Sequence, residues 1–251
     1  MKRFFVLFFV VNVLFCIYGY SQFPDPVYDW MFNWGTRYTP KGDQISAGVL
    51  KEDYVLTVGE KATLKDYWLW YYQNRITFIS EATRTYNCHG YAWHVSEGQD
   101  KVVIFTPNDD KYWTQGSYQE TSSQNKAKVA FTESADHSAI RTSHADTFIS
   151  KWGQSPRFKH HINDCPYEPK TNLKYYKLDP NMTGSTSVLC YNVQRTFNAN
   201  ITHMTGATLT WTPSGYITYY SGAGTPEYTV KGSGDGNSYV NFQITTPTGF
   251  S

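Results

Sequence analysis

The stretch Thr85–Trp93, with the sequence TYNCHGYAW, places one cysteine among small and polar residues where a helical pattern begins. Asn87 belongs to the residue types that cap helix N-termini, so we expect Cys88 in the first turn. A thiol there lies at the positive end of the helix dipole, which favours the thiolate. Gly90 leaves room for another segment to approach. If this chain carries chemistry, the stretch predicts that it starts at Cys88.

The elements around this stretch follow from the spacing of apolar residues. Aromatic and aliphatic residues recur every three or four positions from 63 to 72, which predicts an amphipathic helix with core-packing aromatics. Three short strands are predicted at Lys128–Thr132, Ser138–Thr142 and Thr147–Trp152, the last two joined as a hairpin. The segment Trp152–Tyr167 reads mostly as loop.

A nucleophilic cysteine needs an imidazole to accept and return a proton, and a third group to hold that imidazole. His137 stands at the entrance of a predicted strand, about 50 residues after Cys88 in the order that such pairs require. A regular hairpin would set Ser150 or Lys151 across from His137. His160 follows in the next segment, so the third member is open among Ser150, Lys151 and His160.

Two short motifs carry a resemblance to a known family. The segment Asn87–Tyr91, NCHGY, resembles the Asp-Cys-Ser-Gly signature of NlpC-type and CHAP-type peptidases, and Asp136–Ile140, DHSAI, resembles their histidine strand. These are papain-like enzymes that cleave peptidoglycan stem peptides. The resemblance implies an α+β papain-like fold with Cys88 as nucleophile, His137 as base and a third residue near Ser150.

Four parts are predicted along the chain. Residues 1–21 have the basic start, apolar run and small residues of a secretory signal peptide, with a membrane anchor as the rival interpretation. Residues 22–178 would form the papain-like hydrolase domain and 179–186 a linker. Residues 187–251 show short alternating strands between glycine-rich turns, which predicts a β-sandwich. This part resembles the immunoglobulin-like modules of secreted Bacteroidetes-type proteins.

Composition and cysteine count restrict the partners. With a net charge of +1 there is no global electrostatic case for binding nucleic acid. A peptide or peptidoglycan substrate is predicted, with a secreted, periplasmic or cell-surface location and no membrane span after signal cleavage. Cys88, Cys165 and Cys190 would remain after cleavage, so at least one is unpaired. Whether Cys165 and Cys190 pair stays open, and nothing indicates the oligomeric state.

Two alternatives compete with the hydrolase. The residues His160, His161, Asp164 and Cys165 lie close in sequence, but adjacent histidines do not match zinc-ligand spacing, so no metal or cofactor is predicted. The second alternative is a non-catalytic secreted or surface binding protein. The preferred hypothesis is a secreted cysteine hydrolase that cleaves amide bonds in a peptide substrate, although transfer and deamidation use the same residue types.

Overall fold

The computed structural model describes residues 27–124, 128–132, 136–167, 172–180, 182–184 and 189–246. The predicted signal peptide at residues 1–21 lies outside these ranges. Within them, no helix is both long and apolar enough to cross a membrane.

Helix α2 (Val58–Tyr71) carries the predicted aromatic stripe. It begins with a capping box in which Thr57 Oγ1 accepts from the Glu60 amide at 3.2 Å and the Glu60 carboxylate accepts from the Thr57 amide at 2.7 Å. The helix therefore starts earlier than the aromatic spacing alone suggests. Trp68 packs edge-on against Trp152 with ring centroids 5.2 Å apart, and Leu64 and Tyr72 are buried. The core-packing prediction is confirmed for these residues and wrong for Tyr71, which is 55% exposed.

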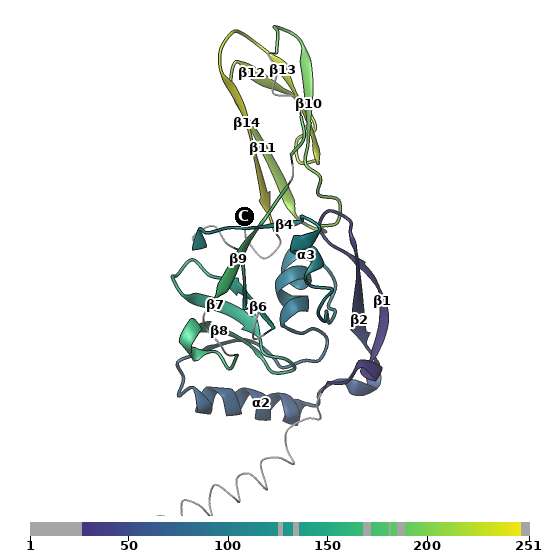
Figure 1. Ribbon diagram of the computed structural model, residues 1–251, viewed down its shortest axis with the longest axis vertical. Helices are drawn as coiled ribbons and strands as arrows, with labels where there is room; N and C mark the ends of the chain where they lie inside the picture. Colours follow the sequence, from purple (N-terminus) through teal and green to yellow (C-terminus); the bar gives the residue numbers. More distant parts are fainter. Residues whose placement is uncertain are drawn as a thin grey trace, which may run out of the picture.

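A seven-stranded antiparallel sheet forms the centre of the larger lobe (Figure 1). In spatial order its strands are β3 (Thr77–Ser80), β8 (Arg157–His161), β7 (Thr147–Lys151), β6 (His137–Arg141), β5 (Val129–Thr132), β9 (Leu173–Leu178) and β4 (Tyr118–Glu120). Strands β6 and β7 form the predicted hairpin. Because β6 is buried along its whole length, it places His137 inside the molecule.

The helical segment 88–97 lies between this sheet and a two-stranded sheet of β1 (Phe32–Tyr38) and β2 (Gln44–Leu50) (Figure 1). Its middle part is the π-helical η3 (Gly90–His94), followed by the 3₁₀ turn η4 (Val95–Glu97). Trp93 in this segment is fully buried in the main core cluster. The short helices elsewhere are η1 (Asp29–Met31), η2 (Glu52–Tyr54), α3 (Lys111–Thr114) and η7 (Ile162–Asp164).

The expected α+β papain-like fold is wrong. The chain is mostly β, with 39% strand against 19% helix, in several antiparallel sheets. One reason is the segment predicted as loop at Trp152–Tyr167, which contains β8 with Phe158 and His160 facing the interior. Another is β4, an edge strand of the same sheet whose Tyr118 is buried. Two short motifs describe a helix start and a strand start, but they do not determine the order of the strands between and after them.

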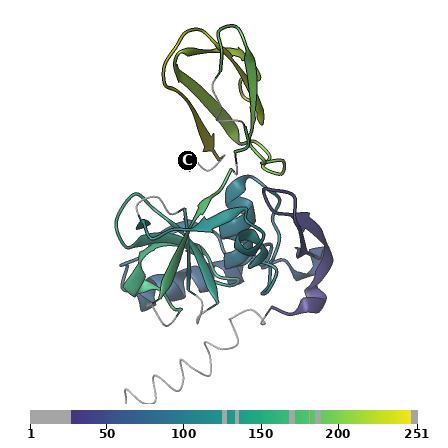
Figure 2. The same cartoon turned by 45° about the horizontal axis from the view of Figure 1, so that its top comes forward.

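The C-terminal strands predicted from alternation are all present. They are β10 (Gln194–Asn198), β11 (Thr208–Gly215), β12 (Ile217–Ser221), β13 (Glu227–Gly232) and β14 (Ser238–Thr245). They form a three-stranded sheet, β10-β13-β12, and a two-stranded sheet, β11-β14. Trp211 stacks on Tyr228 between them, with ring planes 3° apart. Figure 2 shows this unit extending away from the larger lobe.

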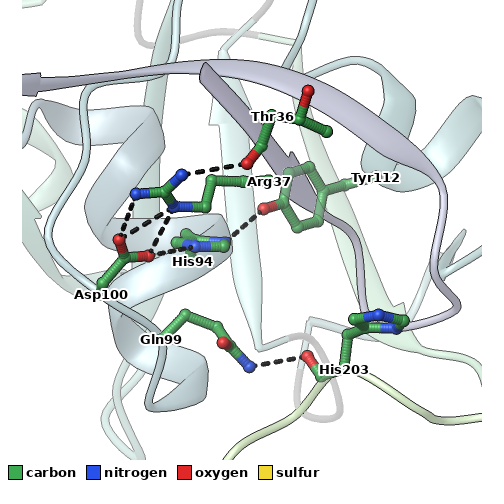
Figure 3. Close-up of polar contacts among 7 residues, drawn as sticks. All are labelled: Thr36, Arg37, His94, Gln99, Asp100, Tyr112 and His203. Carbon is green, nitrogen blue, oxygen red and sulfur yellow. Dashed lines mark hydrogen bonds and ion pairs between the residues drawn. The ribbon is translucent and has the colours of Figure 1, made fainter. Parts of the chain in front are cut away.

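Contacts at the base of the C-terminal unit converge on His203. Gln99, just after the helical segment, donates from its side-chain amide to the His203 carbonyl at 2.7 Å (Figure 3). Tyr38 at the end of β1 stacks on the His203 ring at 4.8 Å. Within the predicted linker 179–186, Thr183 pairs with Asn198 of β10, so this part of the connection is tied to the unit that follows.

Candidate active site

Cys88 occupies a tightly built helix start. Asn87 caps the segment, because its Oδ1 accepts from the Gly90 amide at 2.9 Å, and it also bridges to both the amide and the carbonyl of Ile104. A Cβ on Gly90 would lie 2.0 Å from the Val102 carbonyl oxygen, so only glycine fits there. The predicted cap and the predicted close approach at Gly90 are both confirmed, and together they set the position of Cys88.

The thiol of Cys88 lines a cavity of about 220 Å³. The other lining residues are Val27, Arg84, Tyr86, Asn87, His89, Val103, Phe105, Asp136, Gly153, Gln154 and Tyr167. This volume is below the range of about 300–1,000 Å³ usual for drug-sized ligands. The cavity therefore suits a short length of an extended chain or a single small group, and Cys88 is only 6% exposed within it.

His137 reaches Cys88 from the first residue of β6. Its ring stacks face to face on Tyr167, with centroids 3.8 Å apart and planes 9° apart. The Cys88 and Cys165 thiols both lie close enough to the imidazole to raise its pKa. The structure thus brings together the cysteine and the histidine that the sequence predicts as a pair, and adds a second sulfur on the same ring.

His89, the residue after Cys88, supplies a second imidazole at the thiol. Its Nδ1 lies 2.8 Å from Ser138 Oγ and 3.1 Å from Asp109 Oδ2. Its Nε2 lies 3.4 Å from Asp136 Oδ1. Asp109 is completely buried, whereas the Asp136 side chain is 58% exposed at the cavity. Each ring nitrogen of His89 is therefore close to a carboxylate.

The contacts among Cys88, His89 and His137 oppose the effect of burial on the pKa of each group. Burial raises the pKa of the Cys88 thiol. The charge of His89 and the interaction with His137 lower it by more than burial raises it, so the pKa ends well below the ordinary value. Burial lowers the pKa of His89, yet Cys88 and Asp109 raise it well above the ordinary value. Burial likewise opposes charging of His137, while its interactions with Cys165 and Cys88 raise its pKa to about 9. The favoured state is a thiolate beside imidazolium groups.

The hairpin register predicted for the third member is wrong. Strand β6 pairs Ile140 with Ile149 of β7, and continuing this register places Ser150 level with Ala139 rather than His137. The predicted positions assumed a pairing that the turn at 143–145 does not produce.

Ser150 and His160 contact each other. Trp152 Nε1 donates to Ser150 Oγ at 2.8 Å, and Ser150 lies 2.7 Å from His160 Nε2. The opposite ring nitrogen of His160 lies 3.0 Å from the His161 carbonyl, which fixes Nδ1 as the protonated nitrogen and Nε2 as the acceptor. Neither Ser150 nor His160 lines the cavity at Cys88.

Lys151 is buried beneath the cavity wall. Its Nζ donates to the carbonyls of Thr83 at 2.9 Å, Gly153 at 2.7 Å and Ser155. An ammonium has three N–H donors, and all three are used here. Lys151 therefore holds the 153–155 turn in place. Burial lowers the pKa of its amine well below the ordinary value, while the negative charge of Cys88 raises it.

The remaining cysteines do not pair. Cys165 is buried beside His137 and Cys190 is exposed, and both carry free thiols. The question of a Cys165–Cys190 bridge is thus answered for these residues, and Cys165 is a site residue that the sequence pattern did not indicate.

One grouping of potential metal ligands lies at the site. Donor atoms of His89, Asp109 and Asp136 fall within 4.8 Å of one another. The two carboxylates, however, approach opposite nitrogens of the ring, and Asp136 Oδ1 also accepts from Thr106 Oγ1 at 2.7 Å. This is the geometry of a charged imidazole held between carboxylates, and we assign no cation to it.

His89 and Asp109 are, with Cys165, site residues that sequence reasoning missed. His89 stands where the resembled signature has serine, so the signature assigns it no role. Asp109 lies in the turn after Pro107, where an aspartate is an ordinary turn residue. No local pattern distinguishes it from a surface aspartate, because its burial depends on the packing of distant segments.

No protein-family model matches the chain, no curated protein shows significant similarity to it, and no solved structure matches its fold. The assignment of function therefore depends on the geometry of the site.

Proposed function

We propose that this chain is a cysteine hydrolase that cleaves amide bonds, with Cys88 as nucleophile and His137 as the acid and base. The observation that carries the proposal is the Cys88 thiol, placed at a helix start, lining a cavity and contacted by two imidazoles. A structural cysteine gains nothing from such surroundings, because a buried thiol is most stable in neutral, apolar packing.

In the acylation step, the Cys88 thiolate attacks the substrate carbonyl carbon and forms a C–S bond. The backbone amide of Cys88 at the helix start is positioned to donate to the resulting oxyanion. His137, as imidazolium, gives its proton to the amide nitrogen, and the C–N bond breaks to release the amine. The product left on the protein is a thioester.

In the deacylation step, neutral His137 takes a proton from water as the water oxygen attacks the thioester carbonyl. The C–S bond then breaks, which returns Cys88 as thiolate and releases a carboxylic acid. His137 ends protonated, so the site is ready for another cycle.

For the substrate, we propose a peptide, with peptidoglycan stem peptides as the first class to test, and an extracytoplasmic or cell-surface setting. The cavity combines an apolar wall at Val27, Val103 and Phe105 with polar groups at Asp136 and Gln154. Such a lining suits a peptide segment, which has both amide and apolar groups.

The test is incubation of the purified protein with peptidoglycan and with peptide libraries, with Cys88→Ala as the matched variant. We expect turnover by the parent and none by the variant. Turnover retained in Cys88→Ala would contradict the nucleophile assignment. Mass spectrometry of products then distinguishes hydrolysis from transfer and deamidation.

A non-catalytic binding protein is the second candidate, and one observation favours it. Tyr28, Trp30 and Trp34 at the start of the described chain are strongly exposed, as in surfaces that bind ligands without chemistry. If this candidate is right, both the parent and Cys88→Ala retain the peptide or peptidoglycan and neither releases product.

A further inference from the structure

We propose that the two imidazoles at Cys88 have separate tasks: His89, held between Asp109 and Asp136, is a fixed cation that stabilises the thiolate, and His137 alone transfers protons. This inference rests on the proposed hydrolase function. It assigns a charge-stabilising role to His89 and a positioning role to Asp109.

The contacts of His89 suit a group that keeps its proton. Asp109 lies 3.1 Å from Nδ1 and Asp136 lies 3.4 Å from Nε2, so each nitrogen faces a carboxylate that stabilises an N–H. A base must offer an unprotonated nitrogen to the substrate or to water. Here both nitrogens have a carboxylate beside them, and Ser138 Oγ, 2.8 Å from Nδ1, can accept from an N–H there. A proton lost from either nitrogen would leave a carboxylate beside a lone pair.

Asp109 is the stronger of the two carboxylate partners. It is completely buried, so water does not screen its charge, and the ion pair with His89 is the only ionic contact described for it. Asp136 is mostly exposed and also accepts from Thr106. Solvent screening makes its contribution smaller. The expected order of effect is therefore Asp109 before Asp136.

The contacts of His137 are of a different kind. They are the Cys88 and Cys165 sulfurs and the face of Tyr167. Once Cys88 is acylated, its charge is lost and the support for the imidazolium weakens, so the ring can release and later recover a proton. A pKa of about 9 is consistent with an acid that is charged when the thiolate attacks.

Arg84 also lines the cavity, and its guanidinium donates to Gln154 Oε1 and to the Tyr54 carbonyl. Among the described residues, the other titratable groups that interact with Cys88 are Lys151 and Tyr167. Lys151 donates to three backbone carbonyls. Tyr167 is partly buried, and burial raises its pKa above the ordinary range. Both remain unchanged in the variants below, so a shift in Cys88 ionisation reports the histidines.

The experiment measures the rate of Cys88 alkylation by iodoacetamide against pH in the full chain, alongside hydrolysis. The variants are His89→Gln, Asp109→Asn, Asp136→Asn and His137→Gln, and exposed His144→Gln is the matched control. In His89→Gln we expect the alkylation midpoint to rise and the rate at pH 6 to fall by roughly tenfold or more, since each pKa unit is tenfold in thiolate. Asp109→Asn should shift the midpoint less, Asp136→Asn least, and His144→Gln not at all.

Hydrolysis separates the two tasks. At a pH at which its thiol is fully ionised, His89→Gln should recover most of the parent hydrolysis rate. His137→Gln should stay inactive at every pH, even where its thiol is alkylated readily. An unchanged midpoint in His89→Gln, or hydrolysis that remains lost once its thiol is ionised, would overturn the proposal.

Two safeguards keep the result interpretable. Circular dichroism shows whether His89→Gln and Asp109→Asn fold. If either does not, Asp136→Asn tests the charge of His89 by removing its exposed carboxylate partner. An unshifted alkylation midpoint in Asp136→Asn would then count against the proposal. The alkylation profile needs no substrate. Absence of hydrolysis by the parent would therefore defeat the proposed function without deciding whether His89 stabilises the thiolate.

Discussion

Two histidines of one helical segment, His89 and His94, show how surroundings decide the charge of a buried imidazole. Both are 3% exposed, and each contacts a hydroxyl and a carboxylate. Burial lowers the pKa of both, yet that of His94 ends below the ordinary value and that of His89 well above it. Burial and hydrogen-bond partners of the same type therefore do not determine the protonation state.

The difference lies in uncompensated negative charge. Among the described residues, the carboxylate that contacts His94 is Asp100, which is half exposed and accepts from both Nε and Nη2 of Arg37 (Figure 3). The Arg37 charge also acts directly to lower the His94 pKa. At His89 the anions are the Cys88 thiolate, Asp109 and Asp136, and the thiolate and Asp109 are buried. A buried imidazole becomes a cation where the nearby negative charge outweighs both burial and the nearby positive charge.

The largest expected effect comes from removing the thiolate. Cys88→Ala should abolish hydrolysis, a loss of at least about 10³-fold by analogy with other nucleophile deletions. It should also lower the His89 pKa towards its ordinary value and leave His94 unchanged, because only His89 contacts the sulfur. Imidazole NMR titrations of the parent and the variant measure both rings. A His89 pKa that does not fall would show that the carboxylates alone maintain the charge.

The pH dependence of hydrolysis extends the comparison to His137. Activity should rise with pH as Cys88 ionises, and because the Cys88 pKa is depressed this limb lies below the usual thiol range. It should fall about tenfold per pH unit above a pH of about 9, as His137 loses the proton that it donates. A rate profile from acid to alkaline pH measures both limbs. A rate that stays constant well above pH 9 would exclude His137 as the acid.

A smaller effect is expected at the His94 end of the segment. Tyr112 donates from its hydroxyl to His94 Nδ1 at 2.9 Å in a buried setting. Tyr112→Phe leaves that nitrogen without its donor and should cost about 1–3 kcal/mol in the free energy of unfolding. Denaturant unfolding provides the measurement, with exposed Tyr239→Phe as the control. Equal stability of both variants would mean that the bond contributes nothing.

The smallest effect is expected from Arg37→Gln. Removing this charge should raise the His94 pKa and so make His94 more like His89, because Arg37 lowers it in the parent. The ion pair is partly exposed, so the change in stability should stay below about 1 kcal/mol. NMR titration of His94 gives the direction. A fall in the His94 pKa would show that Arg37 acts mainly by positioning Asp100.

Some features of the site are local and could be predicted from the sequence. The Asn87 cap, the glycine at Gly90, the α2 stripe and the strands of the C-terminal unit all depend on residues a few positions apart. The pairing of Cys88 with His137 was also predicted, since each stands at the start of its own element. The Thr57–Glu60 capping box is also a local sequence pattern, and it would have predicted the correct start of α2.

The tertiary structure decided the remainder, for physical reasons that differ from case to case. The register between β6 and β7, and with it the position of Ser150, depends on the turn and on the packing of both faces. The order of the strands in the large sheet depends on β8. Its residues lie in a segment whose local sequence is typical of a loop, so the sequence does not predict that β8 is a buried strand. Sequence determined that Cys88 begins a helix near a histidine strand. Only the fold decided that Asp109 is buried against His89, because a charge is retained in the interior only where distant segments supply its partner.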